Sequence, residues 1–372
     1  MMADHGRVSA YARALEARVT PSSIVLDIGT GPGILALLAC RAGASRVYAV
    51  EADDVIQLAR EAAHANGFAD RTTFVRGMST DVNLPERVDG IVTALQGVLP
   101  LFGKSLVSIL DARRRFLKPG GWIMPERESL WATLVSSAAD YERLIDTWTT
   151  EYRFDLSAAR TSAVNQWRRT RLDECDVLVA PRCWAVLDYG NLESPNVRGE
   201  MTWTIEHAAM SHGIGVWFDA ETAPGIGWSN SPLTHERHVF RQAFFPWPAP
   251  IELSPGDEVH VRLRADFMGE DYAWGWETNV TDGASACAKV AYRQSSWLAA
   301  PVTTERLRKR ADTFVPDLSD DARIDRRILE LMERRLPLRD IATEIHAAFP
   351  DLLENWDAAL TRAGMLSERY SK

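Results

Sequence analysis

A glycine loop is the first feature of the sequence whose residue types and spacing could do chemistry. It reads Gly29-Thr30-Gly31-Pro32-Gly33 and lies between an apolar run, Ile24 to Ile28, and a helical stretch, Ile34 to Arg41. Glycines permit a tight turn and a close approach of the backbone to a ligand. Glu51 comes 22 residues after Gly29, just past a second apolar run, Arg46 to Val50. A carboxylate at that distance can accept hydrogen bonds from both hydroxyls of a ribose.

Asp27 helps to decide which class of cofactor the loop would hold. A dinucleotide fingerprint reads G-x-G-x-x-G and places a pyrophosphate at a helix N-terminus. This loop reads G-x-G-x-G, and Asp27 stands two residues before it. A carboxylate there repels pyrophosphate and suits the ammonium group of an amino-acid tail. The pattern therefore favours S-adenosylmethionine over NAD, and a purely structural glycine turn is the remaining alternative.

The elements that must position these groups follow a regular alternation. Strand-like and helix-like segments alternate between residues 20 and 135, which predicts a mainly parallel, doubly wound α/β sheet. Further strands are expected at Thr72 to Arg76, Val88 to Thr93 and Trp122 to Met124, and further helices at Asp53 to Asn66 and Leu106 to Leu117. Ligands bind at the carboxyl ends of the strands in such sheets, so the glycine loop and Glu51 should lie together there.

The pattern changes near Ser136, and a β-rich region extends from Val177 to about Tyr292. Short strands between turns, as expected here, are typical of a barrel or a sandwich. The expected strands include Gly199 to Ile205, Ile214 to Phe218, Val239 to Phe245 and Glu258 to Ala265; the helices expected after Pro301 are Ile324 to Arg335, Leu338 to Phe349 and Leu352 to Ala363. We therefore expect a Rossmann-like domain over 1–135, a β-barrel-like domain over 136–300 and a helical module over 301–372.

Composition restricts the function classes and the compartment. The formal charge is −9, whereas nucleic-acid binders usually show a basic balance, so no nucleic-acid partner is expected. No CxxC pair occurs among the four cysteines, which predicts free thiols and no metal site. The chain has neither a long apolar run nor a signal-peptide pattern. We expect a cytoplasmic protein without a membrane partner.

Further motifs accompany the glycine loop in a fixed order. They are Asp4-His5-Gly6-Arg7, the run from Val25 to Leu35, the run from Val47 to Glu51, Leu117-Lys118-Pro119-Gly120-Gly121 before Pro125, and Tyr152-Arg153-Phe154-Asp155-Leu156. In this order they resemble the protein arginine methyltransferase family, from Asp4 to about Trp276. The resemblance implies a Rossmann-like S-adenosylmethionine-binding domain followed by a β-barrel. It also implies a homodimer, because the run after residue 151 resembles the family's dimerisation arm, here about 139–170.

The resemblance implies a set of cofactor-binding residues. In this chain they are Arg7, Asp27, Gly29, Gly31, Gly33, Ile34, Leu35, Glu51, Ala52, Met78, Ser79 and Thr93. Arg7 would hold the carboxylate of the cofactor. Thr80 stands where the family has a glutamate that contacts adenine.

One departure from the family concerns the acceptor. The family carries two glutamates in a hairpin after its fourth strand, and those positions align with Ala94 and Gly103 in a segment, 93–104, that contains no glutamate. Two carboxylates can localise the charge of a guanidinium on one nitrogen and leave another nucleophilic. One such contact at about 4 Å is worth about 4 kcal/mol at an effective dielectric of about 20. Losing both should lower the rate of arginine methylation by orders of magnitude.

Three functions therefore remain open. The first is a methyltransferase acting on a nitrogen or oxygen of a small molecule or peptide, with Gln96, His235, Glu236 and His238 as possible catalytic residues. The family's threonine-histidine-tryptophan loop aligns with His238-Val239-Phe240 or with Thr234-His235-Glu236, and a solvated loop is the alternative for this segment. The second is a guanidine methyltransferase that uses other carboxylates, from Glu126, Glu128, Glu270 or Asp271. The third is a cofactor-binding pseudoenzyme or scaffold.

The C-terminal module has two interpretations. It could bind a partner, such as a peptide substrate, in a small helical or winged-helix-like fold. It could instead pack against the barrel as a cap.

Overall fold

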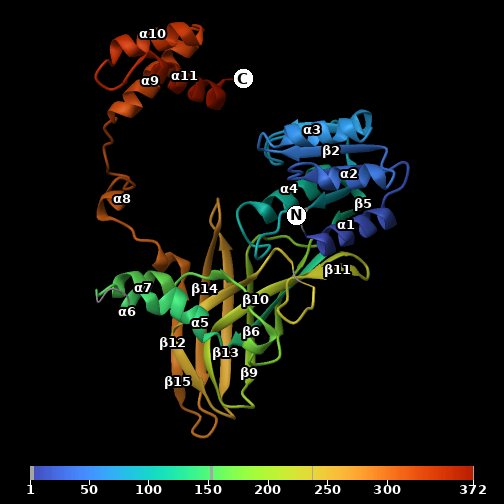
Figure 1. Ribbon diagram of the computed structural model, residues 1–372, viewed down its shortest axis with the longest axis vertical. Helices are drawn as coiled ribbons and strands as arrows, with labels where there is room; N and C mark the ends of the chain where they lie inside the picture. The colour runs from blue at the N-terminus through green and yellow to red at the C-terminus, as the bar shows by residue number, and fades with distance from the viewer. Residues whose placement is uncertain (1–3, 151–153, 237, 372) are drawn as a thin grey trace. The chain divides into compact units, whose positions relative to one another are not determined.

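The computed structural model describes residues 4–150, 154–236 and 238–371, and the chain divides into two compact units (Figure 1). The first unit is Met1–Pro301 and the second is Val302–Lys372. The first unit contains a parallel sheet with helices, followed in sequence by two antiparallel sheets. The expected fold class, a doubly wound α/β domain followed by a β-rich domain and C-terminal helices, is confirmed.

The parallel sheet has the strand order β3-β2-β1-β4-β5. Its strands are β1 (Ile24–Ile28), β2 (Arg46–Glu51), β3 (Thr72–Arg76), β4 (Val88–Thr93) and β5 (Leu117–Met124). All four neighbouring pairs are parallel. The order reverses between β1 and β4, which makes the crevice at their carboxyl ends the expected ligand site. The Lys118–Gly121 segment, which precedes the strand expected at Trp122 to Met124, also lies within β5.

One helix precedes the strands of this sheet and others connect them. They are α1 (His5–Arg18), α2 (Ile34–Arg41), α3 (Ile56–Ala65) and α4 (Ser105–Phe116), with a 3₁₀ turn, η1, at Ala69–Arg71. Helix α1 begins after Asp4, whose side chain accepts a hydrogen bond from the backbone N–H of Arg7. Such a cap satisfies one of the free N–H groups of the first turn. It also brings Arg7 to a fixed place at the start of the helix.

The antiparallel region contains two sheets that share one hydrophobic core. The first has the order β7-β12-β10-β6-β8, with β11 paired to β10, and the second has the order β15-β14-β13-β9. The strands are β6 (Arg127–Val135), β7 (Arg168–Thr170), β8 (Arg182–Asp188), β9 (Val197–Thr204), β10 (Ala209–Ala223), β11 (Ile226–Ser229), β12 (Gln242–Leu253), β13 (Glu258–Phe267), β14 (Tyr272–Thr281) and β15 (Ala288–Ser295). Trp276, Trp247 and Phe245 are among the large side chains that fill this core.

Strand β6 corrects the expected domain boundary. A boundary at residue 135 would leave β6 with the parallel sheet, yet β6 pairs with β10 and β8 in the antiparallel sheet. The change of sheet therefore occurs near Pro125, between β5 and β6. The strand is apolar at alternate positions, but its partners come from residues 182–188 and 213–221, so local sequence could not assign it.

Short helices connect β6 to β7. They are α5 (Ala138–Tyr141), a π-helical turn η2 (Glu142–Asp146), α6 (Thr147–Thr150) and α7 (Ser157–Val164). They cover the region expected as the dimerisation arm. Two residues of its diagnostic run, Tyr152 and Arg153, lie outside the described residues. Two further 3₁₀ turns, η4 (Glu174–Asp176) and η5 (Ser296–Ala299), follow β7 and β15.

The second unit has a hydrophobic core of its own. Its helices are α8 (Thr304–Arg308), α9 (Asp320–Glu333), α10 (Leu338–Ala348) and α11 (Trp356–Tyr370). Ile328, Leu331, Ile341 and Ile345 are wholly buried between them. Ser319 and Asn355 cap α9 and α11 through their side chains. The unit contains helices and no strand among its described residues, so a helical module is observed rather than a winged helix.

Candidate active site

The glycine loop and Glu51 meet at the carboxyl ends of β1 and β2. The carboxylate of Glu51 accepts a hydrogen bond from the backbone N–H of Gly31 at 2.9 Å and another from that of Asp53 at 3.0 Å. Gly29, Gly31 and Gly33 all have positive φ angles. A side chain at Gly31 would meet nothing within 4 Å, so the backbone there is open to a ligand. The sequence placed these groups together correctly.

Asp27 is wholly buried below the loop at the end of β1. One of its oxygens, Oδ2, accepts hydrogen bonds from the Thr30 hydroxyl at 2.6 Å and from the backbone N–H of Ala36 at 2.9 Å. The other oxygen, Oδ1, has no partner in the described chain. Burial raises the pKa of Asp27 to about 7. A cation at Oδ1 would favour the ionised form, which is the environment that an ammonium group provides.

The other expected cofactor residues surround the same edge of the sheet. Leu35, Ser79 and Thr93 are buried, Ile34 is partly buried, and Ala52 and Met78 are exposed. The Ser79 hydroxyl has no hydrogen-bond partner among the described residues. Two orphaned polar atoms, Ser79 Oγ and Asp27 Oδ1, beside an open glycine loop fit a bound polar cofactor, because buried polar groups are normally satisfied.

Arg7 lies among aromatic rings at this edge. Its guanidinium carbon is 4.7 Å from the centroid of Phe240, 5.1 Å from that of Trp228 and 6.0 Å from that of Tyr11. Nη2 donates to the Ala94 carbonyl at 3.0 Å, and Nε has no partner in the described chain. Aromatic faces stabilise a desolvated cation by about 0.5–2 kcal/mol each. The arginine is therefore held as a buried cation whose Nε–H donor is unused.

Gln96 joins Arg7 to a buried carboxylate. Its Oε1 accepts from Arg7 Nη2 at 2.6 Å, and its Nε2 donates to Glu128 at 2.8 Å and to the Tyr11 hydroxyl at 3.1 Å. The hydroxyl of Tyr189 donates to the other oxygen of Glu128. Burial raises the pKa of Glu128 to about 7. Because both ends of the Gln96 amide are engaged, its geometry suits a positioning residue better than a base.

His238 pairs with Asp4, which lies 234 positions earlier in the sequence. His238 Nδ1 lies 2.7 Å from Asp4 Oδ1, and both side chains are almost fully buried. The other carboxylate oxygen of Asp4 accepts from the backbone N–H of Val239 at 3.3 Å. Nε2 of His238 has no partner in the part of the chain that the structure describes. An imidazole with one nitrogen held by a carboxylate keeps the other available for a proton.

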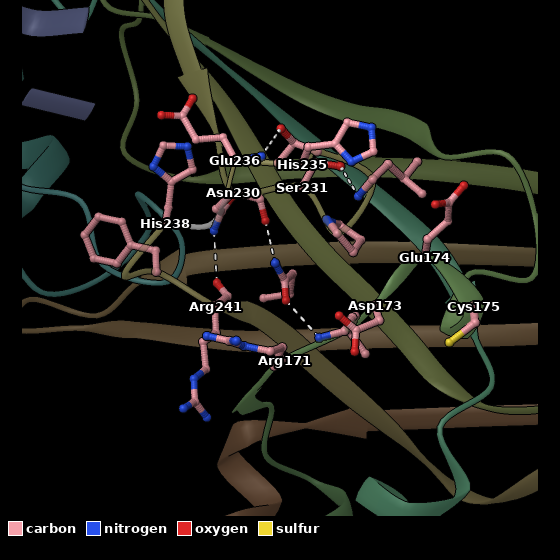
Figure 2. Close-up of a pocket in the computed structure, with 16 residues that line it drawn as sticks. Arg171, Asp173, Glu174, Cys175, Asn230, Ser231, His235, Glu236, His238 and Arg241 are labelled. Atoms are coloured by element: carbon pink, nitrogen blue, oxygen red, sulfur yellow. Dashed lines mark hydrogen bonds between the residues drawn. The ribbon is translucent and has the colours of Figure 1, made fainter. Parts of the chain in front are cut away.

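Two cavities meet at His238. One, of about 560 Å³, extends towards β7 and is shown in Figure 2; the other, of about 510 Å³, extends towards β11. His235 and Glu236 border the first cavity from an exposed loop. The Glu236 carboxylate also lies against Gly6, where a Cβ would come within 1.8 Å of it. Of the four expected catalytic residues, only His238 combines burial, a carboxylate partner and a cavity.

The four alternative carboxylates are dispersed. Glu126 pairs with Arg18, and Glu128 belongs to the Gln96 network. Glu270 and Asp271, in the turn between β13 and β14, contact the segment 93–104, which we align with the family's glutamate hairpin. Asp271 accepts from the backbone N–H of Gly103 at 2.8 Å, and Glu270 pairs with Lys104 at 2.7 Å.

Sequence reasoning missed several residues of this site. Asp4 caps α1, which carries Arg7 and Tyr11, and a signal was present, because positions 4, 7 and 11 share one helix face. Trp228 and Tyr189 carried no such signal, since they arrive from the antiparallel region. Among the residues that the structure describes, no group of three or more His, Cys, Asp or Glu side chains could hold a metal ion.

Two family models match adjoining parts of the chain. One, described as Ribosomal protein L11 methyltransferase (PrmA), matches residues 4–125, and the other, described as Arginine methyltransferase oligomerization subdomain, matches residues 126–269. Their junction coincides with the change of sheet near Pro125.

Curated relatives agree with both matches. Probable protein arginine N-methyltransferase 6 of Arabidopsis thaliana is 32% identical over 275 residues, covering 72% of this chain and 61% of that protein. Protein arginine N-methyltransferase 2 of Mus musculus is 32% identical over 277 residues, covering 70% of this chain and 62% of that protein. Over these residues the chain is similar to protein arginine N-methyltransferases. It spans about three-fifths of the length of these relatives.

Solved structures share the fold. The PRMT1 enzyme-prozyme heterotetrameric complex of Trypanosoma brucei with AdoHcy has a TM-score of 0.71 at 20% identity, covering 79% of this chain and 95% of that chain. Protein arginine methyltransferase 10 of Arabidopsis thaliana has a TM-score of 0.69 at 22% identity, with the same coverage of 79% and 95%. The parallel and antiparallel sheets of this methyltransferase-like chain thus form a known architecture.

Proposed function

We propose that this chain is an S-adenosylmethionine-dependent methyltransferase whose acceptor is an uncharged nitrogen or oxygen of a small molecule or peptide. The likeness to arginine methyltransferases, two of whose solved structures are described with AdoHcy or SAH, supports the cofactor. Asp27, with an orphaned oxygen, suits the cofactor's ammonium group, and Glu51 suits its ribose. Arg7 is the cation available for the cofactor's carboxylate. When bound, S-adenosylmethionine supplies an electrophilic methyl group.

The Asp4–His238 pair is the observation that carries the acceptor assignment. The positions that we align with the family's two glutamates hold Ala94 and Gly103, and without a carboxylate there the hairpin would not localise the charge of a guanidinium. An acceptor that is neutral near pH 7 needs positioning and one proton acceptor instead. If Nδ1–H of His238 donates to Asp4, the lone pair of Nε2 is left free on a side chain that lines the cavity. His238 would take the proton that the acceptor loses.

A guanidine acceptor is the second candidate, and Asp271 is the observation in its favour. Its carboxylate accepts a hydrogen bond from the backbone N–H of Gly103, one of the two positions that we align with the family's glutamates. It is nevertheless exposed to solvent, where a contact with a cation is weaker than in a buried site. Methylation of arginine peptides that is lost in Asp271→Asn would favour this candidate over the first.

A matched pair of histidine variants tests the proposal. Calorimetric titration with S-adenosylhomocysteine is first run on the wild type, Glu51→Gln and the control Glu61→Gln, which lies on the exposed side of α3. We expect micromolar binding that only the Glu51 change weakens, by at least about tenfold, or 1.4 kcal/mol. His238→Gln and His235→Gln are then assayed for methyl transfer to a panel of neutral amines, hydroxyls and arginine peptides.

The expected result is that His238→Gln lowers kcat by about a hundredfold, within the usual range for a general base. His235→Gln should leave kcat unchanged, since that side chain is exposed. Equal losses in both variants would contradict a specific role for His238. Cofactor binding without turnover on any acceptor would support a pseudoenzyme instead.

We also propose that the protein is a homodimer. The match to an oligomerization subdomain and the helices between β6 and β7 support this assembly. Sedimentation velocity at micromolar concentration should give twice the 41.5 kDa mass of the chain. A species of 41.5 kDa at all concentrations would overturn it.

A further inference from the structure

The cavity in Figure 2 has a charged wall that the proposed methyl transfer does not explain. Arg171, just after β7, and Arg241, just before β12, both line it. The antiparallel register pairs Thr170 with Gln242, so the two arginines come opposite each other at the next position. Like charges placed opposite each other on neighbouring strands are destabilising.

Neither arginine is neutralised within the described chain. No ion pair joins Arg171 or Arg241 to a carboxylate among those residues. The exposed arginines of the other sheet differ, because Arg198 pairs with Asp266 at 3.1 Å and Arg262 pairs with Glu200 at 3.3 Å. Two opposed, unneutralised guanidinium groups in a chain of net charge −9 indicate a place for an anionic ligand.

Buried amides hold the backbone beneath both arginines. The Asn230 side chain donates to the carbonyls of Val98 and Arg241 at 3.1 and 3.0 Å and accepts from the backbone of Phe218 at 2.9 Å. The Gln242 side chain accepts from the backbone N–H of Leu172 at 2.9 Å and donates to the Asn230 carbonyl. These bonds join both arginine-bearing segments to the loop after β4. The wall is therefore preorganised relative to the candidate active site.

Carboxylates that line the same cavity restrict the kind of anion. Glu174 and Glu236 both border it (Figure 2). A ligand with several negative charges would be repelled by these carboxylates, whereas one carboxylate on an otherwise neutral or cationic body would not. A volume of about 560 Å³ is within the range of ligand pockets and accommodates a short peptide segment.

We propose that this cavity is the acceptor-binding pocket and that Arg171 and Arg241 bind a carboxylate on a short peptide or peptide-like acceptor. The proposal rests on the proposed function, because His238, which lines the cavity, would receive the acceptor's proton. A bidentate guanidinium–carboxylate contact would fix the orientation of the acceptor. The arginines would thus act on specificity, through the binding of the acceptor.

Two acetylated and amidated tetrapeptide pools test this assignment. They differ only in glutamate or glutamine at one fixed position, and the other positions are randomised over residues with a nitrogen or oxygen nucleophile. Methyl transfer from radiolabelled S-adenosylmethionine is measured for the wild type and for Arg171→Gln/Arg241→Gln. The control is Arg198→Gln/Arg262→Gln, on strands β9 and β13 of the other antiparallel sheet. Calorimetric titration with S-adenosylhomocysteine accompanies each protein.

We expect the wild type and the control to show at least a tenfold higher kcat/KM for the glutamate pool, mainly through KM. The double variant at the cavity should lose this preference and keep its affinity for S-adenosylhomocysteine. Equal kcat/KM for both pools in the wild type, or a preference that survives in the double variant, would overturn the assignment. Absence of turnover on both pools would overturn it as well. Retained S-adenosylhomocysteine binding would then leave the cofactor site standing, whereas loss of binding would remove the proposed function.

Discussion

At the scale of single residues, the candidate site contains a buried hydrogen-bond network. Gln96 joins the carboxylate of Glu128 to the guanidinium of Arg7. The network also engages two tyrosines, Tyr11 and Tyr189. The carboxylate of Glu128 is wholly buried, and both of its oxygens accept hydrogen bonds. It can therefore position Arg7 through Gln96, but it has no free oxygen for an acceptor.

The buried carboxylate of Glu128 predicts a distinctive pH dependence. Its pKa is raised to about 7 in the fold, above the usual 4.5, so the folded state holds the proton more tightly than the unfolded state. Its contribution to stability is therefore fully present below about pH 4.5 and is lost as the pH rises through about 7. Glu128→Gln should remove this loss, so the variant should gain on the order of 2–3 kcal/mol relative to wild type between pH 4.5 and 8.

Urea unfolding of wild type and Glu128→Gln across this pH range measures the difference. Asp27, whose pKa is also about 7, titrates in both proteins and cancels in the comparison. Ser129→Ala, at the next position of β6, removes no ionisable group and is the control, so its difference from wild type should not vary with pH. A flat difference for Glu128→Gln would show that this carboxylate is not the titrating group.

At the scale of elements, the turn from β1 into α2 determines the cofactor site. Gly33 caps α2 in the left-handed region with φ of 90°, and a Cβ there would lie 2.8 Å from the Cβ of Ala59 on α3. Gly31 has φ of 53° and open space around it. One glycine is therefore required by both backbone and packing, and the other by backbone alone.

Alanine at these two glycines separates the two causes. Gly31→Ala should cost about 1–2 kcal/mol from the left-handed backbone alone. Gly33→Ala should cost about 1–3 kcal/mol more, because α3 must also move. Urea unfolding measures the free energy of unfolding of both variants. Gly43→Ala is the control for backbone strain alone, because Gly43 has a positive φ, lies outside the site and has open space around it. Equal costs for Gly31→Ala and Gly33→Ala would contradict the packing between α2 and α3.

At the scale of the whole molecule, the two units have separate cores. The segment 302–318 between the first unit and α9 is exposed almost throughout, which is consistent with a connection rather than a packed layer. No helix among the described residues is long and apolar enough to cross a membrane. The two interpretations of the C-terminal unit, partner binding and a cap, differ in how its removal should affect the stability of the first unit.

Removal of residues 302–372 should leave the first unit folded. We expect its Tm to change by less than about 2 °C, since a loss of 1 kcal/mol would lower the Tm of a domain of this size by about 2–4 °C. The isolated segment should be helical by circular dichroism and should unfold cooperatively, because its core is internal. A large fall in Tm would favour the cap, whereas an unchanged Tm with a raised KM for the acceptor would favour partner binding.

The sequence by itself determined the parallel sheet, the glycine loop, Asp27 and Glu51. These features depend on short-range patterns, since Asp27 and Glu51 lie near the ends of β1 and β2 and the glycine loop follows β1 directly. Only the tertiary structure distinguished His238 from His235, joined Gln96 to Glu128, and assigned β6 to the antiparallel sheet. The reason is sequence separation: His238 meets Asp4 234 positions away, and Gln96 meets Glu128 across 32 positions and a change of sheet. Such contacts are decided by how whole sheets pack, and no local pattern of residues records them.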